Sequence, residues 1–200
     1  MSTTTPRRSA RVERSTKETQ IALELTLDGS GSGEVSTGAG FLDHMLDLLA
    51  RHARLDLTVN ATGDLETGAH HTTEDVGIVL GQALDEALAD RSGITRYGDA
   101  TVPMDEALAV CAIDVSGRPY CAWTGSIPEA TIGGWETELT EEFFRAVANN
   151  ARLTVHVRLL AGTNAHHRVE ASFKSFARAL RAATALDDSE AGIPSTKGTL

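Results

Sequence analysis

Apolar and polar residues alternate along two stretches of the chain, residues 21–29 (IALELTLDG) and 106–117 (EALAVCAIDVSG). A period of two residues is typical of a β-strand with one buried face, and both stretches end in a glycine turn. A helical pattern and then a further strand pattern follow each stretch, over 41–53, 54–61, 140–151 and 152–160. The sequence therefore predicts two similar sets of strands and helices.

A long amphipathic helix closes each set. In the first set its apolar residues are Val76, Val79, Leu80, Ala83, Leu84, Ala87 and Leu88. In the second set they are Phe173, Phe176, Ala177, Leu180 and Ala183. Spacings of three and four residues place each group on one helix face, so we expect both helices to pack against a core.

The two sets also resemble each other residue by residue. HARLDLTV at 52–59 aligns with NARLTVHV at 150–157, and AHHTTED at 69–75 aligns with AHHRVEA at 165–171. Because such matches recur in the same order, we interpret the chain as a duplicated half-domain. We predict a disordered tail over residues 1–13, followed by one compact domain with a first half-repeat over 14–93 and a second half-repeat over 94–200.

The predicted fold class is α+β, with mostly antiparallel sheets and two helices per half packed on them. A parallel βαβ sheet is the alternative, but it would need longer crossover connections. The glycine-rich residues 28–34 (DGSGSGE) join two strand-like runs, which predicts a hairpin turn there.

Composition narrows the class of protein. The formal net charge is −10, which argues against a nucleic-acid-binding protein because such a protein needs a basic surface. No apolar run approaches the roughly 18–20 residues of a membrane span, and the polar N-terminal residues lack the apolar core of a secretory signal. With only two cysteines, Cys111 and Cys121, the chain favours a cytoplasmic protein with reduced thiols.

Two histidine pairs, each followed by a glutamate, stand at the start of the long helices. The residues are His70, His71 and Glu74 in the first half and His166, His167 and Glu170 in the second. A single pair of this kind is usually a solvated helix cap, but its duplication favours a metal site. Adjacent helix residues point about 100° apart, so we expect two ions that each take one histidine from each pair. Imidazole and carboxylate ligands suit Mn²⁺, Fe²⁺ or Zn²⁺.

The repeat adds one candidate ligand from each half. His44 and Glu142 both lie nine residues before the alanine of an ARL segment, so they are equivalent positions. The predicted metal ligands are therefore His44, His70, His71, Glu74, Glu142, His166, His167 and Glu170. Four cations, Arg96, Arg118, Lys174 and Lys197, are candidates for binding an anion, although each taken singly is typical of a solvated surface.

The chain also resembles a known family over residues 14–200. The matching segments are TKET, DGSGSGEVSTGAGFLDHML, HHTTEDVGIVLGQAL, RYGDATVPMDEAL, DVSGRPY, HHRVEASFKSFARALR and IPSTKG. They are similar to imidazoleglycerol-phosphate dehydratase of L-histidine biosynthesis. The resemblance implies a fold like the second domain of ribosomal protein S5. It also implies a hydro-lyase that converts D-erythro-imidazole glycerol phosphate to imidazole-acetol phosphate, with two Mn²⁺ ions per active site at subunit interfaces of a 24-subunit assembly built from trimers.

The resemblance also assigns roles to residues. It implies metal binding by seven of the eight predicted ligands and substrate contact by Glu18. It implies phosphate binding by Arg96, Arg118, Lys174, Ser195 and Lys197, with the last two in a substrate-binding C-terminal tail. Candidates for catalysis are the carboxylates Glu18, Glu74 and Glu170.

One departure from the family pattern concerns the eighth ligand. Where the family has a metal-binding histidine in EHFF, this chain reads EEFF, with Glu142 at that position. Glutamate can bind Mn²⁺, so an active enzyme is the first hypothesis. The alternatives are an impaired or inactive variant that keeps the fold and metal site, and a metallohydrolase that uses the same ions.

Overall fold

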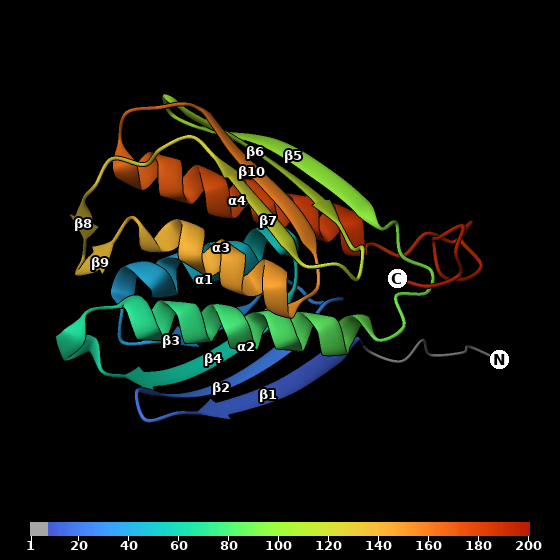
Figure 1. Ribbon diagram of the computed structural model, residues 1–200, viewed down its shortest axis with the longest axis horizontal. Helices are drawn as coiled ribbons and strands as arrows, with labels where there is room; N and C mark the ends of the chain where they lie inside the picture. The colour runs from blue at the N-terminus through green and yellow to red at the C-terminus, as the bar shows by residue number, and fades with distance from the viewer. Residues whose placement is uncertain (1–7) are drawn as a thin grey trace.

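Two four-stranded sheets enclose a double layer of helices in the computed structural model, which describes residues 8–200 (Figure 1). The elements of the first half are β1 Ser9–Ser15, β2 Thr19–Thr26, β3 Gly33–Ser36, α1 Gly40–Ala53, β4 Asp56–Gly63, the 3-10 helix η1 Leu65–Thr67 and α2 His70–Leu88. The elements of the second half are β5 Tyr97–Met104, β6 Ala107–Asp114, β7 Tyr120–Thr124, β8 Thr131–Ile132, β9 Trp135–Glu136, α3 Leu139–Asn150, β10 Thr154–Ala161 and α4 Ala165–Thr184.

Both sheets have the same topology. The strand order is β1-β2-β4-β3 in one sheet and β5-β6-β10-β7 in the other. Two strand pairs in each sheet are antiparallel, and the third pair, β3–β4 or β7–β10, is parallel. The predicted α+β class with duplicated halves and mostly antiparallel sheets is confirmed. The parallel pair arises because α1 or α3 connects its two strands, as a parallel crossover requires.

Two expectations about the first half were wrong. Residues 28–34 do not form a hairpin turn, because β2 and β3 lie on opposite sides of β4 and do not pair. Residues 9–13 of the predicted tail belong to β1, where Val12 pairs with Leu23. Its partly buried residues are Ala10, Val12 and Arg14, which together give only a weak apolar signal. Residues 1–7 of the predicted tail lie outside the described part of the chain.

The core lies between the sheets, among the helices. Its largest buried side chains include Phe143, Phe144, Phe173 and Phe176. Helices α2 and α3 approach closely at Gly81, where a Cβ atom would lie 2.8 Å from the carbonyl oxygen of Val147. All four α-helices of residues 8–200 begin at the same end of the molecule, on the left of Figure 1. Packing therefore gathers the helix N-termini, and with them the histidine pairs, at one end.

Both cysteines are unpaired, with Cys111 buried and Cys121 half-buried. Burial raises the pKa of both thiols, and that of Cys121 reaches about 11. A raised pKa disfavours the reactive thiolate, which agrees with a packing role for both. Among residues 8–200, none of the helices combines the length and apolar character that a membrane span requires.

Candidate metal centre

One group of potential metal ligands forms where the start of α1 meets the start of α4. It contains His44, His166 and Glu170, whose ligand atoms all lie within 4.8 Å of one another. Glu170 Oε2 is 3.0 Å from His166 Nε2 and 3.6 Å from His44 Nε2. Two imidazole nitrogens and a carboxylate oxygen are a donor set that fits Mn²⁺, Fe²⁺ or Zn²⁺. This is the only such group among residues 8–200.

Local sequence and packing together place these side chains. His166 and Glu170 are four residues apart on α4, a spacing that stacks side chains on one helix face. Asn164 caps this helix, because its side-chain oxygen accepts a hydrogen bond from the backbone N–H of His167 at 3.2 Å. The ring of Phe41 on α1 packs edge-on against His166 with centroids 5.1 Å apart. Contact between α1 and α4 thus brings His44 to the pair on α4.

Lys174 completes the buried side of this group. Its Nζ lies 2.5 Å from Glu170 Oε1 and 3.7 Å from the sulfur of Met104. Burial raises the pKa of Glu170, but hydrogen bonds from Lys174 and His166 outweigh that effect and keep it below its ordinary value. Glu170 is therefore an anion at neutral pH with one oxygen turned to Lys174 and the other to the two histidines.

The residues at the repeat-equivalent positions, His70, Glu74 and Glu142, are more dispersed. His70 Nε2 lies 3.8 Å from Glu74 Oε2 on α2, and both side chains are about half exposed. Glu142, the position equivalent to His44, lies 3.5 Å from Arg145 on α3. No group of three close ligands forms from these residues.

The second histidine of each pair contacts a carboxylate from a loop. His71 Nδ1 lies 3.0 Å from Asp64 Oδ2, and His167 Nδ1 lies 2.7 Å from Glu106 Oε2. Each contact raises the pKa of the imidazole and lowers that of the carboxyl. Hydrogen bonds from the backbone N–H of Asn164, the His167 ring and the backbone N–H of Thr163 bring the pKa of Glu106 to about 2.

The predicted phosphate-binding residues divide between two places. Arg96 donates hydrogen bonds to Asp114 Oδ1 and to the carbonyl oxygen of Pro194, both at 2.8 Å. Arg118 is 68% exposed and lies 3.6 Å from the same aspartate. Ser195 and Lys197 follow Pro194 in the C-terminal segment of the chain. This segment lies on the right of Figure 1. Lys174 is not part of this cluster but belongs to the metal-ligand group.

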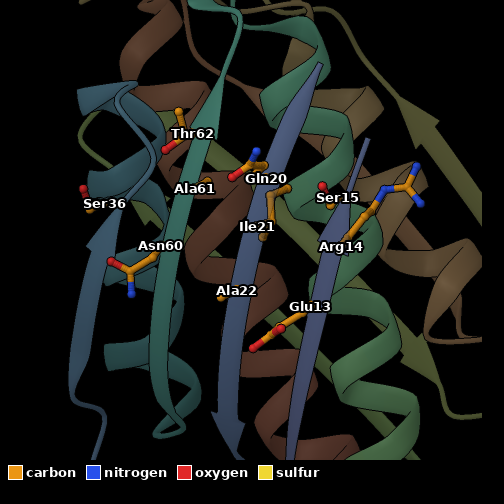
Figure 2. Close-up of a pocket in the computed structure, with 10 residues that line it drawn as sticks. All are labelled: Glu13, Arg14, Ser15, Gln20, Ile21, Ala22, Ser36, Asn60, Ala61 and Thr62. Atoms are coloured by element: carbon orange, nitrogen blue, oxygen red, sulfur yellow. The ribbon is translucent and has the colours of Figure 1, made fainter. Parts of the chain in front are cut away.

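A hollow of about 590 Å³ lies elsewhere, on the outer face of the β1-β2-β4-β3 sheet. Figure 2 shows its side chains on four strands, among them Glu13, Gln20, Asn60 and Thr62, with the helices behind the sheet. None of the predicted site residues lines it, so it is not the candidate site.

Comparison with known proteins decides the family. A model of the imidazoleglycerol-phosphate dehydratase family matches residues 37–180, most of the chain. The chain belongs to this family. The dehydratase of Moorella thermoacetica is 58% identical over 193 residues, which cover 96% of this chain and 98% of that protein. The dehydratase of Xanthobacter autotrophicus is 58% identical over 194 residues, covering 96% and 98%.

Solved structures of the imidazoleglycerol-phosphate dehydratase family share the fold. The enzyme of Staphylococcus aureus superimposes with a TM-score of 0.82 at 44% identity, covering 90% of this chain and 99% of that one. The Pyrococcus furiosus enzyme, solved in complex with (S)-C348, gives a TM-score of 0.82 at 41% identity, covering 94% and 100%. The resemblance seen in the sequence is confirmed, and with it the class of enzyme, a hydro-lyase.

The loop carboxylates Asp64, Asp105 and Glu106 are neighbours of the histidine pairs that sequence reasoning missed. Glu106 is 61 residues from His167, with which it pairs, and Asp64 is seven residues from His71. A separation of 61 residues is far beyond any local pattern, and Asp64 lies outside α2, so no helix or strand pattern links either carboxylate to its histidine.

Proposed function

We propose that the protein catalyses the metal-dependent dehydration of D-erythro-imidazole glycerol phosphate to imidazole-acetol phosphate in L-histidine biosynthesis. Membership of the dehydratase family supports the reaction. The observation that carries metal dependence is the close group of His44, His166 and Glu170. Two unpaired cysteines agree with a reducing compartment, and we place the enzyme in the cytoplasm.

Two Mn²⁺ ions per active site are proposed, one for each of two repeat-equivalent sets of ligands that both draw on the two halves of the chain. His44, His166 and Glu170 would hold one ion, and the equivalent residues Glu142, His70 and Glu74 would hold the other. When bound, such ions act as Lewis acids that draw electron density from the substrate's imidazole ring. Within one chain His71 and His167 lie outside the three-residue group, so we propose that they complete the ion sites of neighbouring copies.

The distance between the metal-ligand group and the candidate phosphate site supports an assembly. Arg96 N donates a hydrogen bond to the carbonyl oxygen of Ala183 at 2.8 Å, whereas His166 lies 17 residues earlier on the same helix. At 1.5 Å per residue this separation is about 25 Å. A small phosphate ester cannot bridge it, so one active site would combine metal ligands and phosphate ligands from different copies. We propose a homo-oligomer of 24 subunits built from trimers.

The phosphate would bind at the cluster of Arg96, Arg118, Ser195 and Lys197. Two of the Arg96 guanidinium donors already form hydrogen bonds to Asp114. The role of Arg96 would therefore be to add positive charge and to shape the phosphate site. The exposed Arg118 keeps N–H donors free for charge-assisted hydrogen bonds to phosphate oxygens. Lys174 would join the phosphate only after leaving Glu170.

Among the three candidate carboxylates, Glu18 and Glu74 suit proton transfer best. Glu18 is half exposed at the turn between β1 and β2, 4.0 Å from His71 Nε2, and Glu74 is also half exposed. Glu170 is only 8% exposed and already bonded to Lys174 and His166. We therefore assign proton transfer to Glu18 or Glu74 and metal binding to Glu170.

Purified protein supplied with imidazole glycerol phosphate and Mn²⁺ is expected to form imidazole-acetol phosphate. Chelation should stop the reaction, and added Mn²⁺ should restore it, because the imidazole ring needs the Lewis acid. Product formation can be followed by absorbance of the enol under alkaline conditions or by phosphorus NMR. Absence of product at every concentration of Mn²⁺, Fe²⁺ and Zn²⁺ would contradict the proposal.

The alternative is a catalytically impaired variant, and the observation that favours it is Glu142. Its carboxylate faces Arg145 rather than a histidine. If the glutamate is a working ligand, Glu142→His is expected to change turnover by less than about tenfold, since both side chains bind Mn²⁺. Turnover that appears only in Glu142→His would establish the impaired variant. Arg145→Gln serves as a control for loss of the ion pair alone.

A further inference from the structure

The two histidines of each pair use different ring nitrogens. The first of each pair, His70 or His166, turns Nε2 toward the glutamate one turn later on its own helix, at 3.8 Å and 3.0 Å. The second, His71 or His167, turns Nδ1 toward a carboxylate outside the helix. The same division occurs in both halves of the duplicated fold.

The loop carboxylates are themselves held in place. Glu106 Oε1 accepts hydrogen bonds from the backbone N–H groups of Thr163 and Asn164, at 3.0 Å and 2.8 Å. Asp64 Oδ2 accepts one from the hydroxyl of Thr67 at 3.1 Å. The carboxylates are thus tied to the loops that lead into α4 and α2, the helices that carry the two histidines.

An ionised carboxylate only accepts hydrogen bonds, so the Nδ1 atom that faces it must carry the proton. In the neutral imidazole the lone pair is then on Nε2, the atom a metal ion would bind. His71 Nε2 lies 4.0 Å from Glu18 Oε1, and His167 Nε2 lies 3.6 Å from Asp105 Oδ2. The contact with the loop carboxylate therefore sets both the ring orientation and the proton position.

We propose that Asp64 and Glu106 are positioning residues that fix His71 and His167 with Nε2 ready to bind a metal ion. This inference rests on the proposed metal-dependent dehydratase. The two carboxylates come from different elements, since Asp64 precedes η1 whereas Glu106 lies in the turn between β5 and β6. Similar contacts built from unlike elements in the two halves are evidence that the contact itself is required.

The test measures Mn²⁺ binding to the assembled protein. Asp64→Asn and Glu106→Gln keep side-chain size but remove the charge and allow an N–H to face Nδ1. Each is expected to raise the Mn²⁺ dissociation constant about 10–100-fold, as loss of a partner behind a metal-binding histidine typically does. Free Mn²⁺ is followed by electron paramagnetic resonance. Matched controls are Glu66→Gln, two residues from Asp64, and Glu129→Gln, both exposed and expected to bind as wild type.

The unfolding temperature of chelated protein separates positioning from a general structural role. The proposal expects it to be unchanged in both variants while Mn²⁺ affinity falls. The proposal would be overturned if the variants bound Mn²⁺ as tightly as wild type. It would also be overturned if Mn²⁺ affinity fell only where the unfolding temperature of the chelated protein fell as well. If wild type binds Mn²⁺ and the two variants bind it more weakly, but wild type forms no product, the proposed function alone would be overturned. Wild type that binds no divalent ion would overturn both.

Discussion

His166→Asn is expected to lower dehydratase turnover about 10³-fold, equivalent to about 4 kcal/mol of transition-state stabilisation. His166 supplies one of the three close ligand atoms in its group, and its Nε2 also lies 3.0 Å from the carboxylate of Glu170. Asparagine keeps a polar side chain but removes the imidazole nitrogen. The measurement is turnover at saturating Mn²⁺, together with the metal content of the purified protein.

His156→Asn is the matched control for this substitution. His156 is an exposed residue of β10 whose ring lies 5.8 Å from that of Tyr120, outside the metal-ligand group. Its replacement should leave turnover unchanged. Equal activity of His166→Asn and His156→Asn would show that the group of His44, His166 and Glu170 does not hold the catalytic metal.

Phe173→Ala is expected to lower the free energy of unfolding by about 3–5 kcal/mol. Phe173 is fully buried on α4, and its ring centroid lies 5.0 Å from that of Phe143 and 4.8 Å from that of Phe144. Truncation would leave a cavity where α4 meets α3. Denaturant unfolding of chelated protein measures the change without the contribution of bound metal.

Phe173→Leu gives a graded comparison. Leucine fills most of the space, so we expect a cost of about 1.5 kcal/mol or less. If Phe173→Ala lowered the free energy of unfolding no more than Phe173→Leu, the neighbouring helices would have to collapse into the space. The contacts of Phe173 with Phe143 and Phe144 would then not be what holds α3 against α4.

Much of the fold followed from the sequence because its signals are local. The three-and-four spacing of Val76, Val79 and Leu80 marked α2, whose inner face is buried. No alternating pattern predicted β1 or the short β7, and β3 was expected as a strand-like run but pairs with β4 instead of β2. Strand order in particular was out of reach, because the antiparallel and parallel partners of β4 are chosen by long-range packing and not by its own pattern.

The sequence by itself determined that two equivalent helices each begin with a histidine pair and a glutamate, because that arrangement occupies only five consecutive residues. It also determined the family. Only the tertiary structure decided which side chains meet. His44 reaches Glu170 and Glu106 reaches His167 through contacts between elements far apart in the chain, and Lys174 turned to Glu170 instead of joining Arg96. Such contacts depend on how helices and sheets pack, which no short stretch of residues encodes.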